Sequence, residues 1–373
     1  MIKPIRLCFV GPANNITLRR WVEWFSLRGH ESTVLTVEPV EDCIACRFNQ
    51  VSLGVPYGPR KLGRLVSAAR AALTIRWLKP DVLHAHYLRG LAWGLPLSGH
   101  HPFVVTPWGS DVLEEQGAFI ERYSKVLTRW VLNSADLVTV HSNYMKTRVC
   151  PLLRSDTRVM RIGWGVDLRQ FRPGLDVRSI RERWQIAKDQ RVIFSPRLAQ
   201  PFYQHDLIVK ALPVIREKVP KVLLVIAEQF ADPVYVDYLR RLAQDLRVDD
   251  HLRLVGCIPY SIMPYWFNLA DAVVMLPRSD GMPNSLLEAM ACGAVPILNK
   301  LPQYTELIHD GMNGFLVDAN RDLARVLIYV LSDSSMKNGI MVKNRTLVME
   351  MADQDREMLK MEFLYSDLAA HAS

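Results

Sequence analysis

Residues 271–293 constrain the fold of this chain more than any other stretch. Ala272 to Leu276 is an unbroken apolar run of strand length, and a polar turn follows from Arg278 to Gly281. Apolar residues at helical spacing then begin after Pro283 and stop at Gly293, which predicts a helix with one broad apolar side. A buried strand that leads through a turn into a helix is the building unit of a doubly wound α/β sheet.

The turn between this strand and this helix is expected to bind an anion, because ligands of open α/β sheets collect where strands end and helices begin. We expect outward-pointing N–H groups at Asn284, Ser285 and Leu286 to hold a diphosphate, with the positive end of the helix dipole behind them. Two carboxylates flank the corner. Asp280 in the turn can reach hydroxyls of a group attached to the phosphate, and Glu288 can accept hydrogen bonds from the vicinal hydroxyls of a ribose.

This pattern resembles the retaining nucleotide-sugar glycosyltransferases of the GT-B fold, specifically family 4, the group 1 glycosyl transferases. Their signature is Glu-Gly-x-Pro-x-x-x-x-Glu-Ala-x-Ala-x-Gly. Here Asp280 stands in place of the first Glu, and Glu288 is the second. Further positions that match are Gly281, Pro283, Ala289, Ala291, Gly293, Pro296, Glu306 to Ile308, Asp310, Gly311, Asn313 and Gly314.

The resemblance implies an α/β protein of GT-B architecture, with two Rossmann-like doubly wound domains facing across a cleft. Residues 1–168 would form the acceptor-binding domain and residues 169–350 the nucleotide-sugar-binding domain. Residues 351–373 would form a helix that packs back on the first domain. The boundary is placed by the segment 158–173, which resembles the interdomain segment of the family.

Several residues of the second half are expected to bind the donor. Arg197 matches the family arginine that neutralises the diphosphate and suits bidentate phosphate contact. The family lysine that accompanies it is missing, and residues 201–204 occupy its place. The resemblance implies backbone contacts between the nucleotide base and Cys257 and Ile258. The donor-binding corner would comprise Gly281, Met282, Pro283, Asn284, Ser285 and Leu286.

In the first half, two pairs of polar residues follow predicted strands and are expected to face the cleft or the acceptor. Asn14 and Asn15 replace a family Gly-Gly pair, so close approach of a ligand requires one of them to adopt a left-handed conformation. His84 and His86 end a strand that resembles the family segment Asp-Val-Ile-His-x-His. We favour structural roles or acceptor contacts for both over catalysis, and no further ligands accompany them that would complete a zinc site.

Trp108 and Asp111 complete the expected catalytic set, which also contains Asp280, Glu288 and Arg197. Trp108 stands where many relatives have a histidine near the transferred sugar, and its flat apolar face could support a sugar ring. Asp111 has two open interpretations. It either orients an acceptor hydroxyl or caps the helix that follows.

The net charge of +8 indicates an anionic partner for the first half of the chain. Residues 1–168 hold 21 lysines and arginines against 13 aspartates and glutamates, whereas residues 169–373 hold 25 of each. A membrane surface or a phosphate-bearing acceptor would fit, while nucleic acid lacks a recognition motif here. Residues 58–79 predict a basic amphipathic helix whose apolar stripe, including Leu65, Leu73 and Trp77, packs on the sheet. Alternatively, its basic face docks on anionic lipid.

Cysteine usage and hydropathy favour a cytoplasmic protein, peripheral at the inner face of the membrane if lipid is bound. The six cysteines have no framework spacing, which indicates reduced thiols, and the Cys43–Cys46 pair has no second pair to complete a metal site. No apolar run reaches the roughly 20 residues of a membrane span, and the first residues predict a strand instead of a signal peptide.

The function implied is retaining, metal-independent transfer of a hexosyl unit from a UDP- or GDP-linked sugar to an acceptor hydroxyl, with no cofactor. The acceptor would be a glycan, a lipid-linked molecule or a small molecule in cell-envelope, polysaccharide or glycolipid biosynthesis. Arg197 and the amides of the corner would hold the charge of the departing diphosphate. Two alternatives stay open: a sugar-nucleotide epimerase of the same fold, with His84 and His86 as acid and base, and a non-catalytic nucleotide-sugar binder.

Overall fold

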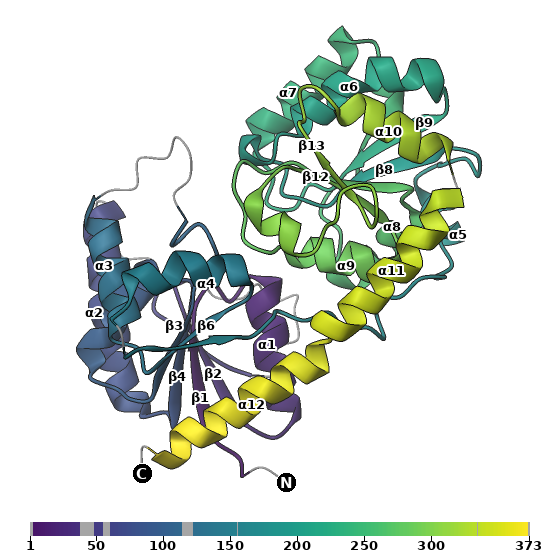
Figure 1. Ribbon diagram of the computed structural model, residues 1–373. Coiled ribbons are helices and arrows are strands. Elements are labelled where there is room, and N and C mark those ends of the chain that lie inside the picture. The colour runs from purple at the N-terminus through teal and green to yellow at the C-terminus, as the bar shows by residue number, and fades with distance from the viewer. Residues whose placement is uncertain are drawn as a thin grey trace. The chain divides into compact units, whose positions relative to one another are not determined.

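The computed structural model describes residues 3–37, 48–54, 60–113, 122–154, 156–333 and 335–371. The side chains of residues 60–62, 64, 122 and 123 are outside this description, as is the Cys43–Cys46 pair. The chain forms two compact units (Figure 1). Unit 1 consists of Met1–Trp164 and Asp355–Ser373, and unit 2 of Gly165–Gln354.

Unit 1 is built on a seven-stranded parallel sheet in the order β3-β2-β1-β4-β5-β6-β7. Its strands are β1 (Arg6–Val10), β2 (Glu31–Thr36), β3 (Asn49–Ser52), β4 (Val82–His86), β5 (Phe103–Thr106), β6 (Leu137–Val140) and β7 (Arg158–Arg161). The order reverses at β1 and β4, which pair directly. This is the strand order of a Rossmann-type sheet.

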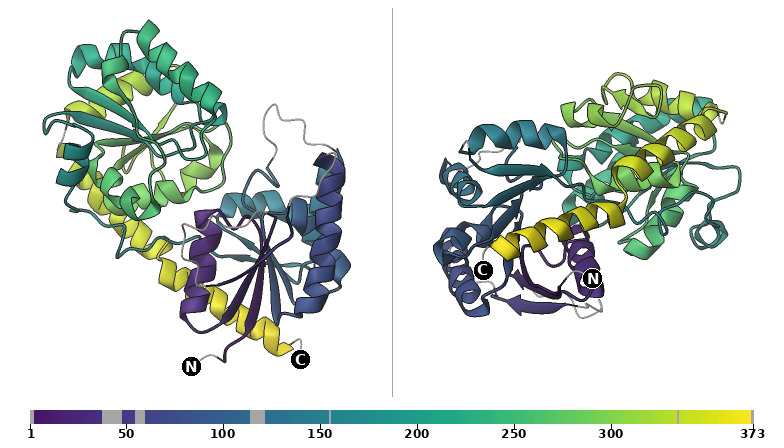
Figure 2. Two further views of the ribbon diagram at one scale, coloured as in Figure 1. Left: turned by 180° about the vertical axis from the view of Figure 1, so that it is seen from behind. Right: turned by 60° about the horizontal axis from the view of Figure 1, so that its bottom comes forward.

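Helices cover both faces of the unit 1 sheet, because side chains alternate between the faces along each strand. Leu7 and Phe9 of β1 pack toward α1 (Ile16–Leu27) and α12 (Gln354–His371). Cys8 and Val10 pack toward the opposite side, which is covered by α2 (Arg60–Leu78), the 3₁₀ segment η1 (Gly90–Ser98), α3 (Arg122–Asn133) and α4 (Asn143–Val149). Both views of Figure 2 show α12 lying along the unit 1 sheet.

The predicted apolar stripe of α2 does not pack on the sheet. Leu65, Leu73 and Trp77 are exposed, and the buried side of the helix carries Ala68, Ala71, Ala72 and Ile75. The reason is close packing: a Cβ added to Gly94 of η1 would lie 1.8 Å from the carbonyl oxygen of Ala68. Only small side chains fit at such an approach, so the bulky residues of α2 point outward.

Unit 2 repeats the arrangement with a six-stranded parallel sheet in the order β10-β9-β8-β11-β12-β13. Its strands are β8 (Arg191–Ser195), β9 (Val222–Ile226), β10 (Leu252–Leu254), β11 (Ala272–Met275), β12 (Val295–Asn299) and β13 (Phe315–Val317). One face is covered by α6 (His205–Lys218), α7 (Pro233–Asp245) and α10 (Leu323–Ser332). The other is covered by α8 (Met263–Leu269), α9 (Asn284–Cys292) and α11 (Ser335–Met351), and the short α5 (Arg178–Arg183) contributes Ile180 to the same core.

The expectation of two Rossmann-like doubly wound sheets is therefore confirmed. Ligands of such sheets bind outside the carboxyl ends of the strands, at the point where the strand order reverses. In unit 1 this point lies beyond Val10 and His86, and in unit 2 it lies beyond Ser195 and Met275. Among the described residues, none of the helices has the length and apolar run needed to cross a bilayer.

Candidate functional site

The reversal point of unit 2 brings together Arg197, which follows β8, and Asp280, which follows β11. The guanidinium Nη2 of Arg197 lies 3.0 Å from Oδ2 of Asp280, and the two side chains are 16% and 13% exposed. The two residues are 83 positions apart in the chain, so their meeting is a consequence of the sheet order. A cation and a carboxylate, both mostly shielded from water, occupy the place where a nucleotide is expected in this topology.

Asp280 forms hydrogen bonds through both of its carboxylate oxygens and through its backbone carbonyl oxygen. Its Oδ2 accepts a hydrogen bond from the Tyr304 hydroxyl at 2.9 Å, and its Oδ1 accepts one from the backbone N–H of Gly281 at 2.9 Å. The side-chain amide of Gln303 donates to the Asp280 carbonyl oxygen at 2.6 Å. The carboxylate is therefore fixed in one orientation, with Arg197 on one side and Tyr304 on the other.

One donor of Arg197 has no partner among the described residues. Its Nη1 donates to the Ser285 hydroxyl at 3.2 Å, and its guanidinium carbon lies 4.8 Å from the centre of the Tyr203 ring. Its Nε is buried and has no hydrogen-bond partner. Burial opposes the charge, but the Asp280 carboxylate outweighs it and raises the pKa of Arg197. A permanently charged group with an unused donor is suited to a phosphate oxygen.

The helix of the signature, α9, begins at Asn284 with Pro283 as its N-cap and ends at Gly293 in the left-handed conformation, as the sequence predicts. The expectation for Leu286 is wrong, however. Its N–H is not directed outward but donates to the Pro283 carbonyl oxygen at 3.1 Å, because the first turn is tightened to an i to i+3 bond. The Ser285 hydroxyl donates weakly to the sulfur of Met275 at 3.3 Å.

Glu288 lies on the first turns of α9 and is 4% exposed. The Tyr260 hydroxyl donates to its Oε1 at 2.7 Å. A carboxylate offers about four acceptor sites on two oxygens, so this bond leaves capacity for further donors. Three tyrosines thus support the charged groups of unit 2, and sequence reasoning did not single out any of them: Tyr203, Tyr260 and Tyr304.

The loop after β10 carries Cys257 and Ile258. The Cys257 side chain is exposed, and Ile258 is buried with its carbonyl oxygen accepting a 2.6 Å hydrogen bond from the Gln229 side chain. Glu228 forms two hydrogen bonds with the same loop. Its Oε2 accepts from the Gly256 N–H at 2.7 Å, and its own N–H donates to the Gly256 carbonyl oxygen. No sequence pattern pointed to Glu228 as a residue of this site.

The reversal point of unit 1 contains a cavity of about 380 Å³, which we call the β1–β4 cavity. It is lined by the turn after β1, including Asn14, by His86 at the end of β4, and by Arg89 and Trp108. Asn15 lies beside it as the N-cap of α1 and accepts from the Thr17 N–H at 2.8 Å. Neither asparagine has a positive φ, so the expected left-handed conformation is absent in this turn.

The two histidines of β4 are both buried but have different surroundings. His84 is hydrogen-bonded through both ring nitrogens, Nδ1 to the Tyr365 hydroxyl and Nε2 to Thr106 Oγ1 at 2.7 Å. His86 lines the β1–β4 cavity, and neither of its ring nitrogens has a hydrogen-bond partner. Burial lowers the pKa of both, for His86 to about 3. Both imidazoles are therefore neutral near pH 7, and the ring of His84 has no nitrogen left for a substrate.

Trp108 packs edge-on against Trp164, with ring centroids 5.8 Å apart, and its indole N–H is buried without a partner. Asp111 braces the loop that carries Trp108. Its carboxylate is 4% exposed and accepts backbone N–H groups of Leu88 at 2.9 Å, Trp108 at 3.0 Å and Gly109 at 2.9 Å. Burial raises the pKa of Asp111 although these hydrogen bonds oppose the shift.

Among the described residues, no three side chains of His, Cys, Asp or Glu gather as metal ligands do.

Two family models match this chain. Residues 6–142 match the model described as "Glycosyl transferase 4-like", and residues 176–346 match "Glycosyl transferases group 1". Together they cover every strand of the two sheets except β7. The chain belongs to the group 1 glycosyltransferases.

Curated relatives agree with this family. A GDP-mannose-dependent alpha-(1-6)-phosphatidylinositol monomannoside mannosyltransferase of Mycolicibacterium smegmatis is 30% identical over 203 residues, 52% of this chain and 52% of the relative. A D-inositol 3-phosphate glycosyltransferase of Frankia alni is 28% identical over 267 residues, 66% of this chain and 63% of the relative. The match therefore spans about half the length of the first of these relatives.

Solved structures share the fold over nearly the whole chain. Sucrose-phosphate synthase from Thermosynechococcus elongatus superposes with a TM-score of 0.83 at 18% identity, covering 98% of this chain and 99% of the other. HepE of Anabaena, solved with UDP and glucose, gives 0.80 at 17% identity over 98% and 100%. WaaG, a glycosyltransferase of lipopolysaccharide biosynthesis, gives 0.78 at 15% identity over 96% and 99%. These likenesses show the GT-B fold.

Proposed function

We propose that this protein transfers a glycosyl unit from a nucleotide diphosphate sugar to an acceptor hydroxyl, with retention of the anomeric configuration and without a metal. The observation that carries the proposal is the buried Arg197–Asp280 pair at the reversal point of unit 2, beside the start of α9. The names of the relatives make GDP-mannose the first donor to test, and a UDP-linked hexose the second.

Binding of the donor would use the charges of this corner. Arg197 offers its unpartnered Nε to the diphosphate, and the amino end of α9 adds its dipole. Asp280, held by Tyr304, accepts hydrogen bonds from sugar hydroxyls, and Glu288, held by Tyr260, accepts them from the ribose. Catalysis is then mostly electrostatic stabilisation of charge on the leaving diphosphate, and no side chain needs to act as a nucleophile.

The acceptor would bind unit 1 in the β1–β4 cavity. His86 and Trp108 line this cavity, and their ring nitrogens are buried without hydrogen-bond partners among the described residues. Hydroxyl groups of a glycan, a lipid-linked sugar or a small polyol would satisfy them. Asp111 would contribute by stabilising the loop that carries Trp108, because its carboxylate already accepts hydrogen bonds from backbone N–H groups. The names of the relatives suggest a role in glycolipid or cell-envelope polysaccharide biosynthesis.

The outer side of α2 supports peripheral contact with an anionic membrane. Leu65, Leu73 and Trp77 are 54%, 63% and 79% exposed, and the exposed Arg70 and Arg76 lie between them on the same helix. Apolar residues interleaved with basic ones on an outward face are typical of helices that lie in a bilayer interface. Low-salt flotation with vesicles rich in anionic lipid tests this. Leu73→Ser with Trp77→Ser should reduce retention, whereas Val214→Ser with Val342→Ser, an exposed pair in unit 2, should not.

Release of nucleoside diphosphate from a panel of GDP- and UDP-sugars, with acceptors present, tests the main proposal. Arg197→Gln should lower kcat/KM by about a hundredfold, because it removes the charge aimed at the leaving group. Arg191→Gln is the matched control, since Arg191 begins β8, the strand that precedes Arg197, and pairs with Asp271. Tight donor binding with no release across the panel would leave only the non-catalytic binder.

Product analysis tests the finer parts of the proposal. NMR of the purified product should show the anomeric configuration of the donor, and an inverted product would exclude the retaining mechanism. Turnover should persist in the presence of EDTA. Loss of activity that added Mg²⁺ or Mn²⁺ restores would contradict metal independence.

A further inference from the structure

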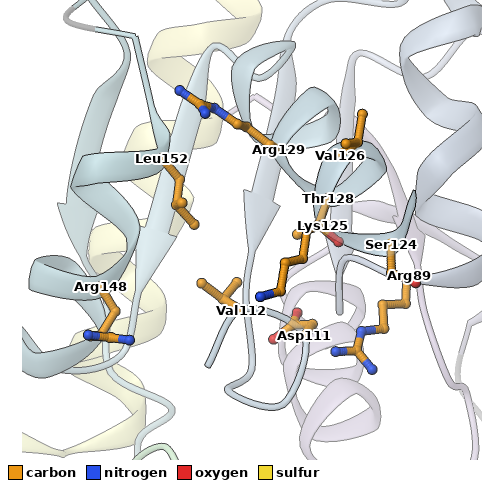
Figure 3. A pocket seen from close by; sticks show the side chains of 10 residues that line it. All are labelled: Arg89, Asp111, Val112, Ser124, Lys125, Val126, Thr128, Arg129, Arg148 and Leu152. Atoms are coloured by element: carbon orange, nitrogen blue, oxygen red, sulfur yellow. The ribbon is translucent and has the colours of Figure 1, made fainter. Parts of the chain in front are cut away.

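Unit 1 contains a second cavity, of about 350 Å³, whose lining is rich in positive charge; we call it the basic cavity (Figure 3). Four of its lining residues are cationic. They come from three elements: Arg89 follows β4, Lys125 and Arg129 lie on α3, and Arg148 lies on α4.

The described residues that line the basic cavity carry little negative charge. Asp111 is the only carboxylate among the described lining residues, and three backbone N–H groups already donate to it. Arg129 and Arg148 form no ion pair with any described residue. Arg89 donates through Nη2 to the Ser110 carbonyl oxygen at 2.5 Å, and its Nε is buried without a partner. Arg129 and Arg148 therefore carry charge that no described carboxylate pairs with.

The side chains are arranged around an opening instead of against one another. Figure 3 shows the ends of Lys125 and Arg89 directed toward the part of the cavity beside Asp111, with Arg148 on the other side of Val112. Ser124, which is 8% exposed, adds a hydroxyl to the lining. The guanidinium of Arg129 is turned away from this part of the cavity. Cations from separate elements beside one cavity can be bridged by a single polyanionic group.

Arg89 connects this cavity with the proposed acceptor site, because it lines both the basic cavity and the β1–β4 cavity. A ligand that places hydroxyls near His86 and Trp108 therefore has a cationic group beside it. Arg89 belongs to both linings, so the two cavities are neighbours.

We propose that the basic cavity binds a phosphate group carried by the acceptor, while the hydroxylated part of the same acceptor lies in the β1–β4 cavity. This rests on the proposed function, because it names the acceptor class of that site. Lys125 and Arg89 contact the phosphate, and Arg148 and Arg129 add their charge at the rim. Phosphate fits better than a carboxylate, since it offers more oxygens and up to two charges to donors from three elements.

The test measures phosphate binding directly by isothermal titration of glycerol 1-phosphate and inorganic phosphate into the full chain, at constant ionic strength set with chloride. Glycerol should give no signal. Lys125→Gln with Arg148→Gln should weaken phosphate binding by about tenfold, the loss expected for one charge-assisted hydrogen bond. Lys146→Gln with Lys343→Gln removes the same charge from exposed positions outside the cavity and should have no effect.

Vesicles separate a lipid headgroup from a free phosphate as the source. Retention on phosphatidylcholine vesicles with added phosphatidylinositol is compared with retention on vesicles that hold the same charge as phosphatidylserine. Loss in the Lys125/Arg148 variant of either the soluble binding or the phosphatidylinositol preference supports the site. No loss in either, or an equal loss in the control variant, overturns it.

Failure of this inference can be distinguished from failure of the proposed function. Donor turnover without acceptor, as hydrolysis, uses the corner of unit 2 and should be equal in the Lys125/Arg148 variant and the wild type. With a phosphorylated acceptor, the variant should raise KM for the acceptor with little change in kcat. If phosphate binds but no nucleotide sugar is ever turned over, the phosphate site stands and the glycosyltransferase activity does not.

Discussion

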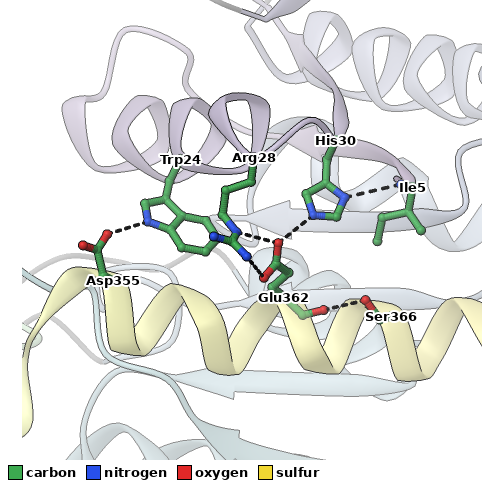
Figure 4. Close-up of polar contacts among 7 residues, drawn as sticks. All are labelled: Ile5, Trp24, Arg28, His30, Asp355, Glu362 and Ser366. Atoms are coloured by element: carbon green, nitrogen blue, oxygen red, sulfur yellow. Dashed lines mark hydrogen bonds and ion pairs between the residues drawn. The ribbon is translucent and has the colours of Figure 1, made fainter. Parts of the chain in front are cut away.

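Arg28 at the end of α1 and Glu362 on α12 form a two-point ion pair although they are 334 positions apart in the chain (Figure 4). Arg28 Nε lies 2.7 Å from Oε1 and Nη2 lies 2.9 Å from Oε2, and His30 Nε2 lies 2.9 Å from the same Oε1. The Glu362 side chain is 2% exposed. This carboxylate fixes α12 on the sheet of unit 1, together with the hydrogen bond from Trp24 Nε1 to Asp355 at 2.8 Å.

Glu362→Gln should destabilise unit 1 by about 2–4 kcal/mol, because the partly exposed Arg28 and the buried His30 lose their charged acceptor. The matched control is Asp367→Asn on the same helix, whose side chain is 36% exposed and lies 3.6 Å from Arg158. Urea unfolding of both variants checks the difference. Equal midpoints would show that the ion pair contributes nothing to the docking of α12.

A second prediction concerns Gly165, which has φ of +71°, and a Cβ there would lie 2.5 Å from Cα of Gln354. Gly174 has a similar φ of +80° but nothing within 4 Å of an added Cβ. Gly174→Ala should cost only the conformational term, about 1–2 kcal/mol. Gly165→Ala should cost more, because the backbone at Gln354 must also move. Thermal unfolding of the two variants isolates the steric part, and an equal loss of Tm would contradict the close approach.

The buried histidines of unit 1 predict a pH dependence. Burial lowers the pKa of His86 to about 3 and that of His141 to about 4, from the ordinary histidine value of about 6.5. Because the unfolded chain binds protons that the folded chain does not, stability falls as pH decreases from about 6.5 toward these values. Each group should cost about 2 kcal/mol between pH 6.5 and pH 5. His86→Phe should reduce the slope of stability against pH by one proton, and an unchanged slope would contradict the burial of a neutral ring.

Asp280 should not be replaceable by the glutamate of the family signature. The longer side chain displaces the carboxylate from Tyr304 and Arg197, which hold Asp280 at 2.9 and 3.0 Å. Asp280→Glu should therefore lower turnover by about tenfold, the effect of a misplaced catalytic group of this kind. Tyr304→Phe, which removes only one hydrogen bond, should have a smaller effect. Faster turnover in the glutamate variant would show that the corner is not adapted to aspartate.

Trp108→Ala should reduce transfer to the acceptor while donor hydrolysis continues, because Trp108 lines the β1–β4 cavity of unit 1, whereas the donor corner is formed by residues of unit 2. Trp108→Phe keeps a flat ring and should retain part of the transfer. Product and free sugar are measured in the same reaction. Parallel loss of both products in the alanine variant would point to unfolding or to a different site.

Much of the fold and of the donor corner could be predicted from the sequence because local signals coincide there. The apolar run of β11, the turn and the glycine at the end of α9 each indicate one structure, and they agree with one another. Arg197 and Asp280 could be identified as residue types that bind a diphosphate sugar. Their direct ion pair could not, since it depends on strands β8 and β11 being neighbours in the sheet.

The failures have physical causes. The pattern of α2 predicted that Leu65, Leu73 and Trp77 face inward. They face outward because Gly94 of η1 approaches Ala68 so closely that only a small side chain fits at the contact. Helix α11 was not predicted. Its buried residues Ile340, Asn344 and Val348 have helical spacing, but the middle one is polar and donates to the Asn313 carbonyl oxygen at 2.8 Å, so the apolar periodicity is broken.

The return of α12 to unit 1 has a consequence for biosynthesis. A ribosome releases the N-terminal half first, yet the surface formed by Trp21 and Phe25 receives Met361 and Tyr365 only after residues 165–354 have been made. Unit 1 is therefore translated first but can finish folding only after unit 2 has been made. Until then, the apolar face that α12 covers is accessible to chaperones. A fragment that stops at Trp164 should bind a hydrophobic dye that the full chain excludes.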